Sequence, residues 1–284
     1  MNKISYSQIS MFSECPKRWN LNYVDKLRVS ESNIYLIFGT AMHEVLQTYL
    51  EIMYYDSVKN ANFLNLEEML RDKLIEQFKK AEEEGKSPCT KEDLQEFFQD
   101  GCDILDFFKK KRGEYFSRRG YKLIGCEVPI DVELKKNINM IGYIDIVILD
   151  EIHNTLKIYD IKTSTMGWNK WQKKDENKTQ QLLLYKQFYS KQYNHPIDKI
   201  EVEYFIVKRK LWEKAMFPQK RVQKFSPASG KPSLNKVANR LDIFLNEAFT
   251  DDGEKKDDMV ATPSKKSCRW CEFNKTEHCS QGVR

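Results

Sequence analysis

Apolar residues recur at helical spacing through the first part of the chain. This spacing predicts helices over about residues 8–14, 39–55, 64–84 and 94–116. In the second of these helices, Ala41, Val45, Leu46 and Leu50 fall on one face. A turn signal at residues 84–88, which contains glycine and proline, separates the last two helices. We therefore expect the N-terminal region, residues 1–120, to be helical.

After residue 120 the period of the pattern changes from helical spacing to alternation. Alternating apolar and β-branched residues predict strands over about residues 121–133, 138–149, 155–163 and 199–209. Helical spacing returns over about residues 176–193, between the third and fourth strands, and over residues 233–249. The order of elements is helices, a three-stranded meander, a crossover helix and a further strand. This order predicts an α/β fold, in which helices flank a mixed sheet. A polar linker and a cysteine-rich segment follow at residues 251–284.

Composition limits the classes of protein that the chain can represent. Of 284 residues, 40% are hydrophobic and 31% are charged, which is enough apolar mass for a core and excludes global disorder. No window approaches eighteen consecutive apolar residues and the N-terminus has no apolar signal core, so we expect a cytoplasmic, intracellular protein without a membrane partner. The net charge of +5 is only a weak indication of nucleic-acid binding.

The strongest candidate chemistry lies on a predicted hairpin formed by residues 142–148 and 157–163. If the hairpin folds symmetrically, Asp145 lies opposite Asp160, and Lys162 lies on the same face as Asp160. Carboxylates opposed at roughly 5 Å repel each other, and a divalent cation such as Mg²⁺ or Mn²⁺ removes that repulsion. The lysine could then orient a water molecule or stabilise charge on a phosphate. Charged strand residues usually face solvent, but the many neighbouring isoleucines indicate buried strands.

Three of the seven cysteines crowd into the last seventeen residues. Cys268, Cys271 and Cys279 would supply soft ligands to a metal, because a two-residue separation lets both sulfurs point inward. An odd number of cysteines without a signal sequence disfavours a disulfide framework. Three ligands need a fourth, and the residues alone leave His278 and four distant cysteines as alternatives.

The hairpin pattern, Gly142-x-Ile-Asp145 followed by Asp160-x-Lys162, resembles the PD-(D/E)xK nuclease superfamily in its RecB-like branch. Further matches are the Gln-x-x-x-Tyr motif of residues 181–185, residues 5–10 with the following Cys-Pro and Trp, and the histidine segment of residues 39–44. The resemblance covers most of the chain and is weakest over residues 56–118. It implies a restriction-endonuclease-like core over residues 121–250.

The resemblance also implies roles for matched residues. It assigns binding of Mg²⁺ or Mn²⁺ to His43, Asp145, Asp160 and the carbonyl of Ile161. It makes Lys162 the catalytic lysine, with Gln181 and Tyr185 supporting it or gripping the strand. Glu127 lies where related nucleases often place a further acid, and an ordinary strand glutamate is the alternative.

For the cysteines, the relevant relatives are AddB-type helicase-nucleases and CRISPR-associated spacer-acquisition nucleases. These often combine one N-terminal and three C-terminal cysteines around a [4Fe–4S] cluster, which implies a set of Cys15, Cys268, Cys271 and Cys279 here. Such a cluster would hold residues 251–284 against the N-terminus. The seven residues before Cys279 are a long spacing for the motif, which leaves zinc with His278 as the alternative.

A basic strip follows the fourth predicted strand, with seven Lys and Arg residues between positions 208 and 224 and only Glu213 opposing them in the sequence. Aromatic residues are interleaved, as in surfaces that neutralise phosphates and stack on unpaired bases. We predict DNA contacts from Lys208, Arg209, Lys210, Lys220 and Arg221, with Trp168 and Trp171 on a loop over the substrate. A solvated basic hairpin, and tryptophans that anchor a loop to the core, are the alternatives.

These observations predict a metal-dependent deoxyribonuclease. The resemblance favours an exonuclease that acts on DNA with a free end in recombination, repair or replication, with a helicase or recombination protein as the expected partner. One alternative is a non-catalytic module that binds nucleic acid or a helicase and keeps the nuclease fold. Another is a zinc-stabilised scaffold with structural carboxylates. The sequence has no Gly-x-x-x-x-Gly-Lys phosphate loop, so the chain is not itself a helicase.

Overall fold

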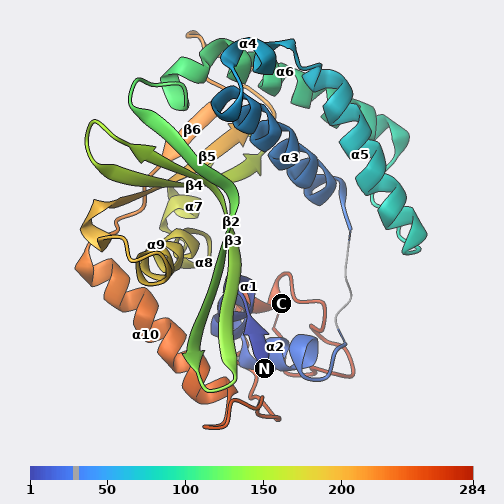
Figure 1. The fold of residues 1–284 in the computed structure, drawn as a ribbon. Helices are drawn as coiled ribbons and strands as arrows, with labels where there is room; N and C mark the ends of the chain where they lie inside the picture. Colours follow the sequence, from blue (N-terminus) through green and yellow to red (C-terminus); the bar gives the residue numbers. More distant parts are fainter. Residues whose placement is uncertain (28–31, 284) are drawn as a thin grey trace.

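A mixed sheet lies at the centre of the protein, with helices on both of its faces (Figure 1). The structure is a computed structural model, and it describes residues 1–27 and 32–283. The strands are β1 (Asn2–Ile4), β2 (Tyr121–Lys135), β3 (Ile138–Asp150), β4 (Thr155–Ser164), β5 (Ile200–Lys208) and β6 (Val222–Phe225). β3 pairs with β1 in parallel and with β2 and β4 in antiparallel fashion, while β5 pairs with β4 in parallel and with β6 in antiparallel fashion. The predicted α/β class is confirmed.

Most predicted helices are present, with bounds that differ by a few residues. The helices are α1 (Tyr6–Glu14), α2 (Pro16–Tyr23), α3 (Ile34–Tyr55), α4 (Val58–Phe63), α5 (Leu66–Glu83), α6 (Lys91–Tyr115), α7 (Lys170–Lys174), α8 (Glu176–Thr179), α9 (Gln181–Gln192), α10 (Lys231–Ala248) and α11 (Lys265–Cys268), with a 3₁₀ turn at Ile197–Lys199. The crossover helix predicted as one segment is two, α8 and α9. The elements that the pattern missed are mostly short, because a period needs several repeats to be detected.

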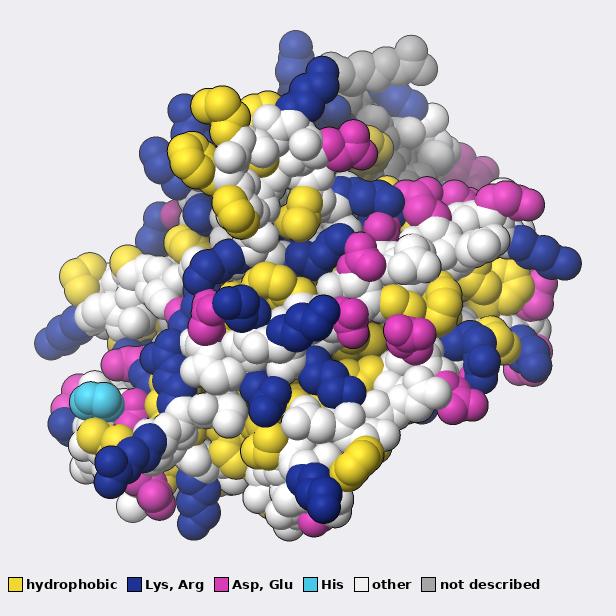
Figure 2. All heavy atoms as spheres, turned by 90° about the horizontal axis from the view of Figure 1, so that it is seen from above, with side chains coloured by type: hydrophobic (Ala, Val, Ile, Leu, Met, Phe, Trp, Pro, Cys, Tyr) yellow, Lys and Arg dark blue, Asp and Glu magenta, His cyan; other side chains and the backbone are white. Residues whose placement is uncertain are grey.

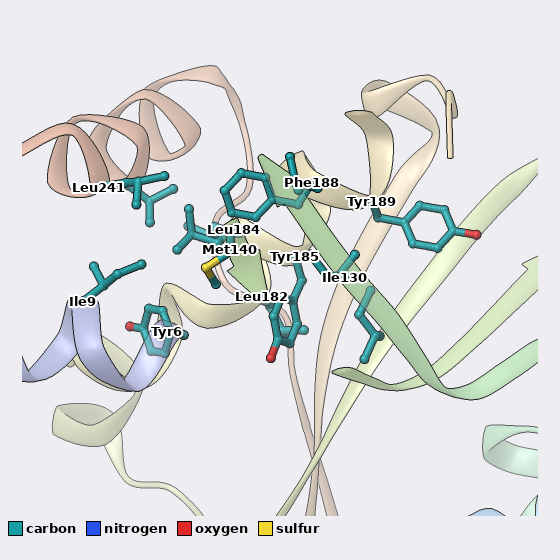
Figure 3. Packing of buried hydrophobic residues seen from close by; sticks show 14 of the residues in the cluster. Tyr6, Ile9, Ile130, Met140, Leu182, Leu184, Tyr185, Phe188, Tyr189 and Leu241 are labelled. Atoms are coloured by element: carbon teal, nitrogen blue, oxygen red, sulfur yellow. The ribbon is translucent and has the colours of Figure 1, made fainter. Parts of the chain in front are cut away.

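Each face of the sheet has its own hydrophobic core. On one face, β3 and β4 pack against α3, α5 and α6, with Phe38 and Phe108 among the buried side chains. On the other face they pack against α1, α2, α9 and α10, where Trp19 is fully buried. Figure 3 shows this second core, with Ile9 from α1 and Leu241 from α10 approaching the residues of α9. The strands between the two cores are therefore buried on both sides.

The two ends of the chain lie close together (Figure 1). Asn2 Nδ2 donates a hydrogen bond to the Gly253 carbonyl at 2.7 Å, and Arg18 pairs with Glu272 at 2.7 Å. The C-terminal segment thus contacts β1 and α2. The division into residues 1–120, 121–250 and 251–284 stays a prediction, because these contacts set no boundaries.

Candidate active site

The site begins where the β3–β4 hairpin opens. The ladder runs from Asp150–Thr155 to Ile146–Tyr159, which is the predicted symmetric register. It ends one pair before Asp145 and Asp160, because β4 continues along β5 as far as Ser164 while β3 stays paired with β2. The two carboxylates therefore lie at the first position beyond the ladder, where the strands part.

The alternation of side chains along β3 slips at this point. Ile144 packs in the core beside α9 and α10, whereas Ile146 packs in the core beside α3, although a regular strand would place both on one face. On the neighbouring strand, Glu127 has a φ of 49°, a left-handed conformation that costs about 1–2 kcal/mol for a side chain with a Cβ. This local distortion turns Asp145 toward the opening between the strands.

The carboxylates, the lysine and the histidine are brought together at the opening. Lys162 Nζ lies 2.7 Å from Asp160 Oδ2. Asp145 Oδ2 accepts a hydrogen bond from the backbone N–H of Ile161 at 2.6 Å and lies 3.6 Å from His43 Nδ1 on α3. Residues from three separate elements, α3, β3 and β4, thus form one cluster.

Helix α9 reaches the cluster from the opposite face. Lys162 Nζ donates a hydrogen bond to Gln181 Oε1 at 3.3 Å, and Gln181 Nε2 donates to the Tyr185 hydroxyl at 3.1 Å. The two residues are one helical turn apart, as the Gln-x-x-x-Tyr spacing predicts. Figure 3 shows Tyr185 among the packed residues of this helix. The chain Tyr185–Gln181–Lys162–Asp160 fixes the direction of the lysine.

Burial dominates the electrostatics of the site. It raises the pKa of Asp145 and of Asp160 to about 6, against the opposing effect of the Lys162 ammonium. Burial also acts to lower the pKa of Lys162, but Asp160 and Asp145 outweigh it, so the pKa of the lysine is raised. The pKa of His43 is lowered, first by burial and then by Lys162. Among the described residues, the two largely buried carboxylates thus face one ammonium, that of Lys162, so negative charge at the site exceeds positive charge when both carboxylates are ionised.

The residues fit a hard divalent cation. Within residues 1–27 and 32–283, no three His, Cys, Asp or Glu side chains are already arranged as a metal-holding group. Asp160 Oδ2 is nevertheless buried without an aligned hydrogen bond, although it lies in ion-pair contact with Lys162. Carboxylate oxygens, a backbone carbonyl and an imidazole are ligands that suit Mg²⁺ or Mn²⁺. The donor set is therefore suitable, although the side chains are not yet gathered around a common point.

Gln47 joins three parts of the site and was missed by the sequence analysis. Its Nε2 atom donates to Glu127 Oε1 at 2.6 Å and to the Asp145 carbonyl at 3.1 Å. Gln47 follows His43 by one turn of α3 and is buried. That spacing was the available signal, but no pattern in the sequence says that β2 lies opposite this turn.

The glycine of the hairpin pattern has a steric reason. A Cβ atom at Gly142 would lie 3.0 Å from the ring and from the hydroxyl oxygen of Tyr185. This separation is tight for a buried contact, and Tyr185 cannot move without disturbing its hydrogen bond to Gln181. Glycine here therefore lets α9 approach β3.

Gly142→Ala is expected to lower the DNA cleavage rate about tenfold, because a displaced Tyr185 releases Gln181 from Lys162 and overpacking costs about 1–3 kcal/mol. Steady-state digestion of labelled DNA measures the rate. Gly113→Ala is the matched control, since nothing lies within 4 Å of a Cβ atom at that helical position. Equal rates for both variants would contradict the steric role of Gly142.

The four cysteines of the predicted cluster line one narrow cavity between the chain ends. Cys15 comes from the α1–α2 junction, and Cys268, Cys271 and Cys279 come from the C-terminal segment. His278 lines a different hollow. The remaining three cysteines lie elsewhere, and burial raises the pKa of the Cys126 thiol to about 12. Cysteines from both ends of the chain thus line the same cavity, but within residues 1–27 and 32–283 they do not form a metal-holding group.

The basic strip is not an open row of charge. Arg209 is buried, pairs with Glu96 at 2.9 Å and Asp100 at 2.6 Å, and stacks 3.8 Å from the centre of the Phe97 ring. Its neighbours are also paired with α6: Lys210 with Glu96 and Asp100, Lys220 with Glu114, and Arg221 with Asp103. The expectation that only Glu213 opposes the strip is therefore wrong. Figure 2 shows the same mixing, with acidic side chains among the Lys and Arg of the face seen from above.

The two tryptophans of the predicted substrate loop have different surroundings. Trp168 is buried against Tyr204 and Phe225, with ring centroids 4.9 and 6.1 Å away. Trp171 is 69% exposed. Contact of either residue with DNA stays a prediction.

Arg209→Ala is expected to lower the free energy of unfolding by about 2 kcal/mol, because it removes a charged hydrogen bond to the buried Asp100, which keeps only Lys210 as a partner, and the contact with the Phe97 ring. Urea denaturation followed by circular dichroism measures this change. Lys214→Ala, an exposed lysine of the same segment, is the control and should leave stability unchanged. A midpoint for Arg209→Ala equal to that of the control would show that the buried ion pair contributes nothing.

The sequence model of the PD-(D/E)XK nuclease superfamily matches residues 3–276, so the chain belongs to this superfamily. Its mixed sheet flanked by helices is the restriction-endonuclease-like fold, as predicted, and the match supports a hydrolytic nuclease that acts on DNA. Members typically use Mg²⁺ or Mn²⁺. No curated protein matches the chain.

Among solved structures, a candidate exonuclease from Eubacterium rectale is similar, with a TM-score of 0.46 and 11% identity over 85% of this chain and 77% of that one. Separately, no helix in the described part of the chain is long and apolar enough to cross a membrane.

Proposed function

We propose that this protein is a metal-dependent deoxyribonuclease of the RecB-like branch that hydrolyses phosphodiester bonds at free DNA ends. The observation that supports it most is the arrangement of Lys162, Asp160 and Asp145 where β3 and β4 separate, with Lys162 Nζ 2.7 Å from Asp160 Oδ2. Asp160 is buried and Asp145 and Lys162 are partly buried, and charges withdrawn from water in this way cost stability, which favours a functional role for the group.

In the proposed reaction, Asp145, Asp160, His43 and the carbonyl of Ile161 hold the cation. When bound, Mg²⁺ or Mn²⁺ supplies an activated water and neutralises charge on the phosphate. Lys162 stays protonated because the two carboxylates raise its pKa, so it presents an ammonium to the developing charge on the phosphate oxygens.

The supporting residues hold this arrangement in place. Gln181 holds the Lys162 ammonium toward the opening by accepting its hydrogen bond, and Tyr185 holds Gln181. Glu127 is a candidate for the further acid, since Gln47 ties its carboxylate to the Asp145 backbone.

The preference for DNA ends rests on the family resemblance. Recombination, repair or replication would supply such ends, and a helicase or recombination protein would be a suitable partner.

For the cysteines, we propose a structural [4Fe–4S] cluster held by Cys15, Cys268, Cys271 and Cys279. Its support is that all four cysteines line one cavity, although their side chains are not gathered around a common point in the described residues. Zinc is the alternative metal.

The test is digestion of end-labelled linear DNA and closed circular DNA with Mn²⁺ or Mg²⁺, using anaerobically purified protein. Loss of linear DNA with survival of circles supports an exonuclease. Cutting of circles keeps the nuclease but removes the end requirement. Binding without cutting in either metal would replace the nuclease by a non-catalytic DNA-binding module.

A further inference from the structure

A hollow of about 440 Å³ extends from Lys162 along the surface. One wall is α1 with the start of α2, and the other is formed by Trp168, α8 and the start of α9. The lining side chains include Tyr6, Ser7, Ser10, Arg18, Trp168 and Lys178. Its volume lies within the range of sites that take small organic ligands. The hollow is therefore continuous with the candidate active site and is large enough for a unit of substrate.

The lining has the chemistry of a phosphate and sugar site. It contains three cations, Arg18, Lys162 and Lys178, against one carboxylate, Glu14. Arg18 and Lys162 already have acidic partners. Lys178 is exposed, lies 5.9 Å from the centre of the Trp168 ring, and has no ion pair with any residue that the structure describes. An unpaired cation over an aromatic ring, with hydroxyls opposite, suits a nucleotide.

Hydrogen bonds between the walls close one end of the hollow. Asn177 Nδ2 donates to Glu14 Oε1 at 2.6 Å, and the Tyr6 hydroxyl donates to the Glu176 and Asn177 carbonyls at 3.0 and 3.1 Å. Arg240 stabilises this contact between the walls by donating hydrogen bonds to Ser13 Oγ on α1 and to Gln180 Oε1, which precedes α9. Beyond Glu14 and Asn177, which line both, lies a separate hollow that contains Lys174. The hollow therefore ends at the contacts between α1 and α8 and does not continue into the second one.

We propose that this hollow binds one nucleotide of a single DNA strand beside the scissile phosphate, with Lys178 on a backbone phosphate. The site therefore takes unpaired ends, and a blunt duplex must fray before it is cut. This inference rests on the proposed nuclease function. It adds that the bound substrate is single-stranded and that Lys178 is a binding residue outside the carboxylate-lysine cluster.

Fluorescence anisotropy with labelled oligothymidine and a labelled blunt duplex, in EDTA and at several salt concentrations, tests the proposal without catalysis. Lys178→Ala is expected to weaken oligothymidine binding five- to tenfold and to reduce the salt slope by about 0.7, the value for one lost phosphate contact on a single strand. Lys174→Ala is the control, with the same charge change four residues away on the other hollow. Wild-type protein should bind the blunt duplex at least tenfold more weakly.

Two results would overturn the proposal: equal binding of duplex and single strand, or Lys178→Ala behaving as Lys174→Ala. Digestion with Mn²⁺ in parallel separates this failure from failure of the proposed function. If wild-type protein cuts DNA and Lys178→Ala cuts it with an unchanged KM, the nuclease stands and the nucleotide site is wrong. If wild-type protein cuts no DNA, the proposed nuclease function is wrong. The anisotropy data then show only whether the hollow binds a single strand.

Discussion

Lys162→Ala is expected to lower the DNA cleavage rate by on the order of 10³-fold, because it removes the ammonium held beside Asp160 and the charge that would face the phosphate. Asp160→Asn should cause a similar loss of rate. The two variants should differ in Mn²⁺ binding by calorimetry. The lysine is no metal ligand, so Lys162→Ala should retain binding, whereas Asp160→Asn should lose most of it.

Lys157→Ala is the matched control for this experiment. Lys157 lies on the same strand, β4, and pairs with Glu201 at the far end of the hairpin, so its loss should leave the rate unchanged. Thermal unfolding of each variant checks that the loss of rate is not a loss of fold. Cleavage by Lys162→Ala at the rate of the Lys157→Ala control would refute the catalytic assignment.

The sequence predicted those parts of the site that follow a regular period. Strand alternation and a polar turn were enough to give the pairing of Ile146 with Tyr159 and to place Asp160 and Lys162 on one face. Helical spacing placed Gln181 and Tyr185 on one side of α9, where they contact each other. These features depend on residues that are close together in the sequence, so the spacing of those residues is enough to predict them.

Other parts depend on contacts that no local pattern contains. The slip of β3 at Asp145 breaks the period of two, and the left-handed Glu127 beside it is not a residue type that signals such a conformation. The pairing of Arg209 with Asp100 joins residues 109 positions apart, so the basic strip looked unopposed in the sequence. Gln47 was missed for the same reason. The sequence thus indicated the chemistry of the site, and the tertiary contacts determined which charges remain free.

Loss of Cys15 is expected to remove the metal of the cysteine cavity and to destabilise the protein. Cys15→Ser is expected to abolish iron and brown colour in anaerobically purified protein and to lower Tm by on the order of 10 °C, because binding free energy at a structural metal site contributes directly to folding. The fall in Tm should be large because the metal would join the α1–α2 junction to the C-terminal segment. Without it, contacts such as Arg18–Glu272 must hold the two ends alone, and partly exposed ion pairs contribute little.

Cys89→Ser is the matched control, since Cys89 is a free, partly exposed cysteine outside the cavity. It should keep iron, colour and Tm. Metal analysis distinguishes the alternatives: one zinc without colour, lost with Cys15→Ser, would mean that the cavity is a zinc site. Equal metal content and Tm in both variants would show that Cys15 is no ligand. In that case the four cysteines line one cavity only because the ends of the chain pack together, and the C-terminal segment is held by its polar contacts and by packing.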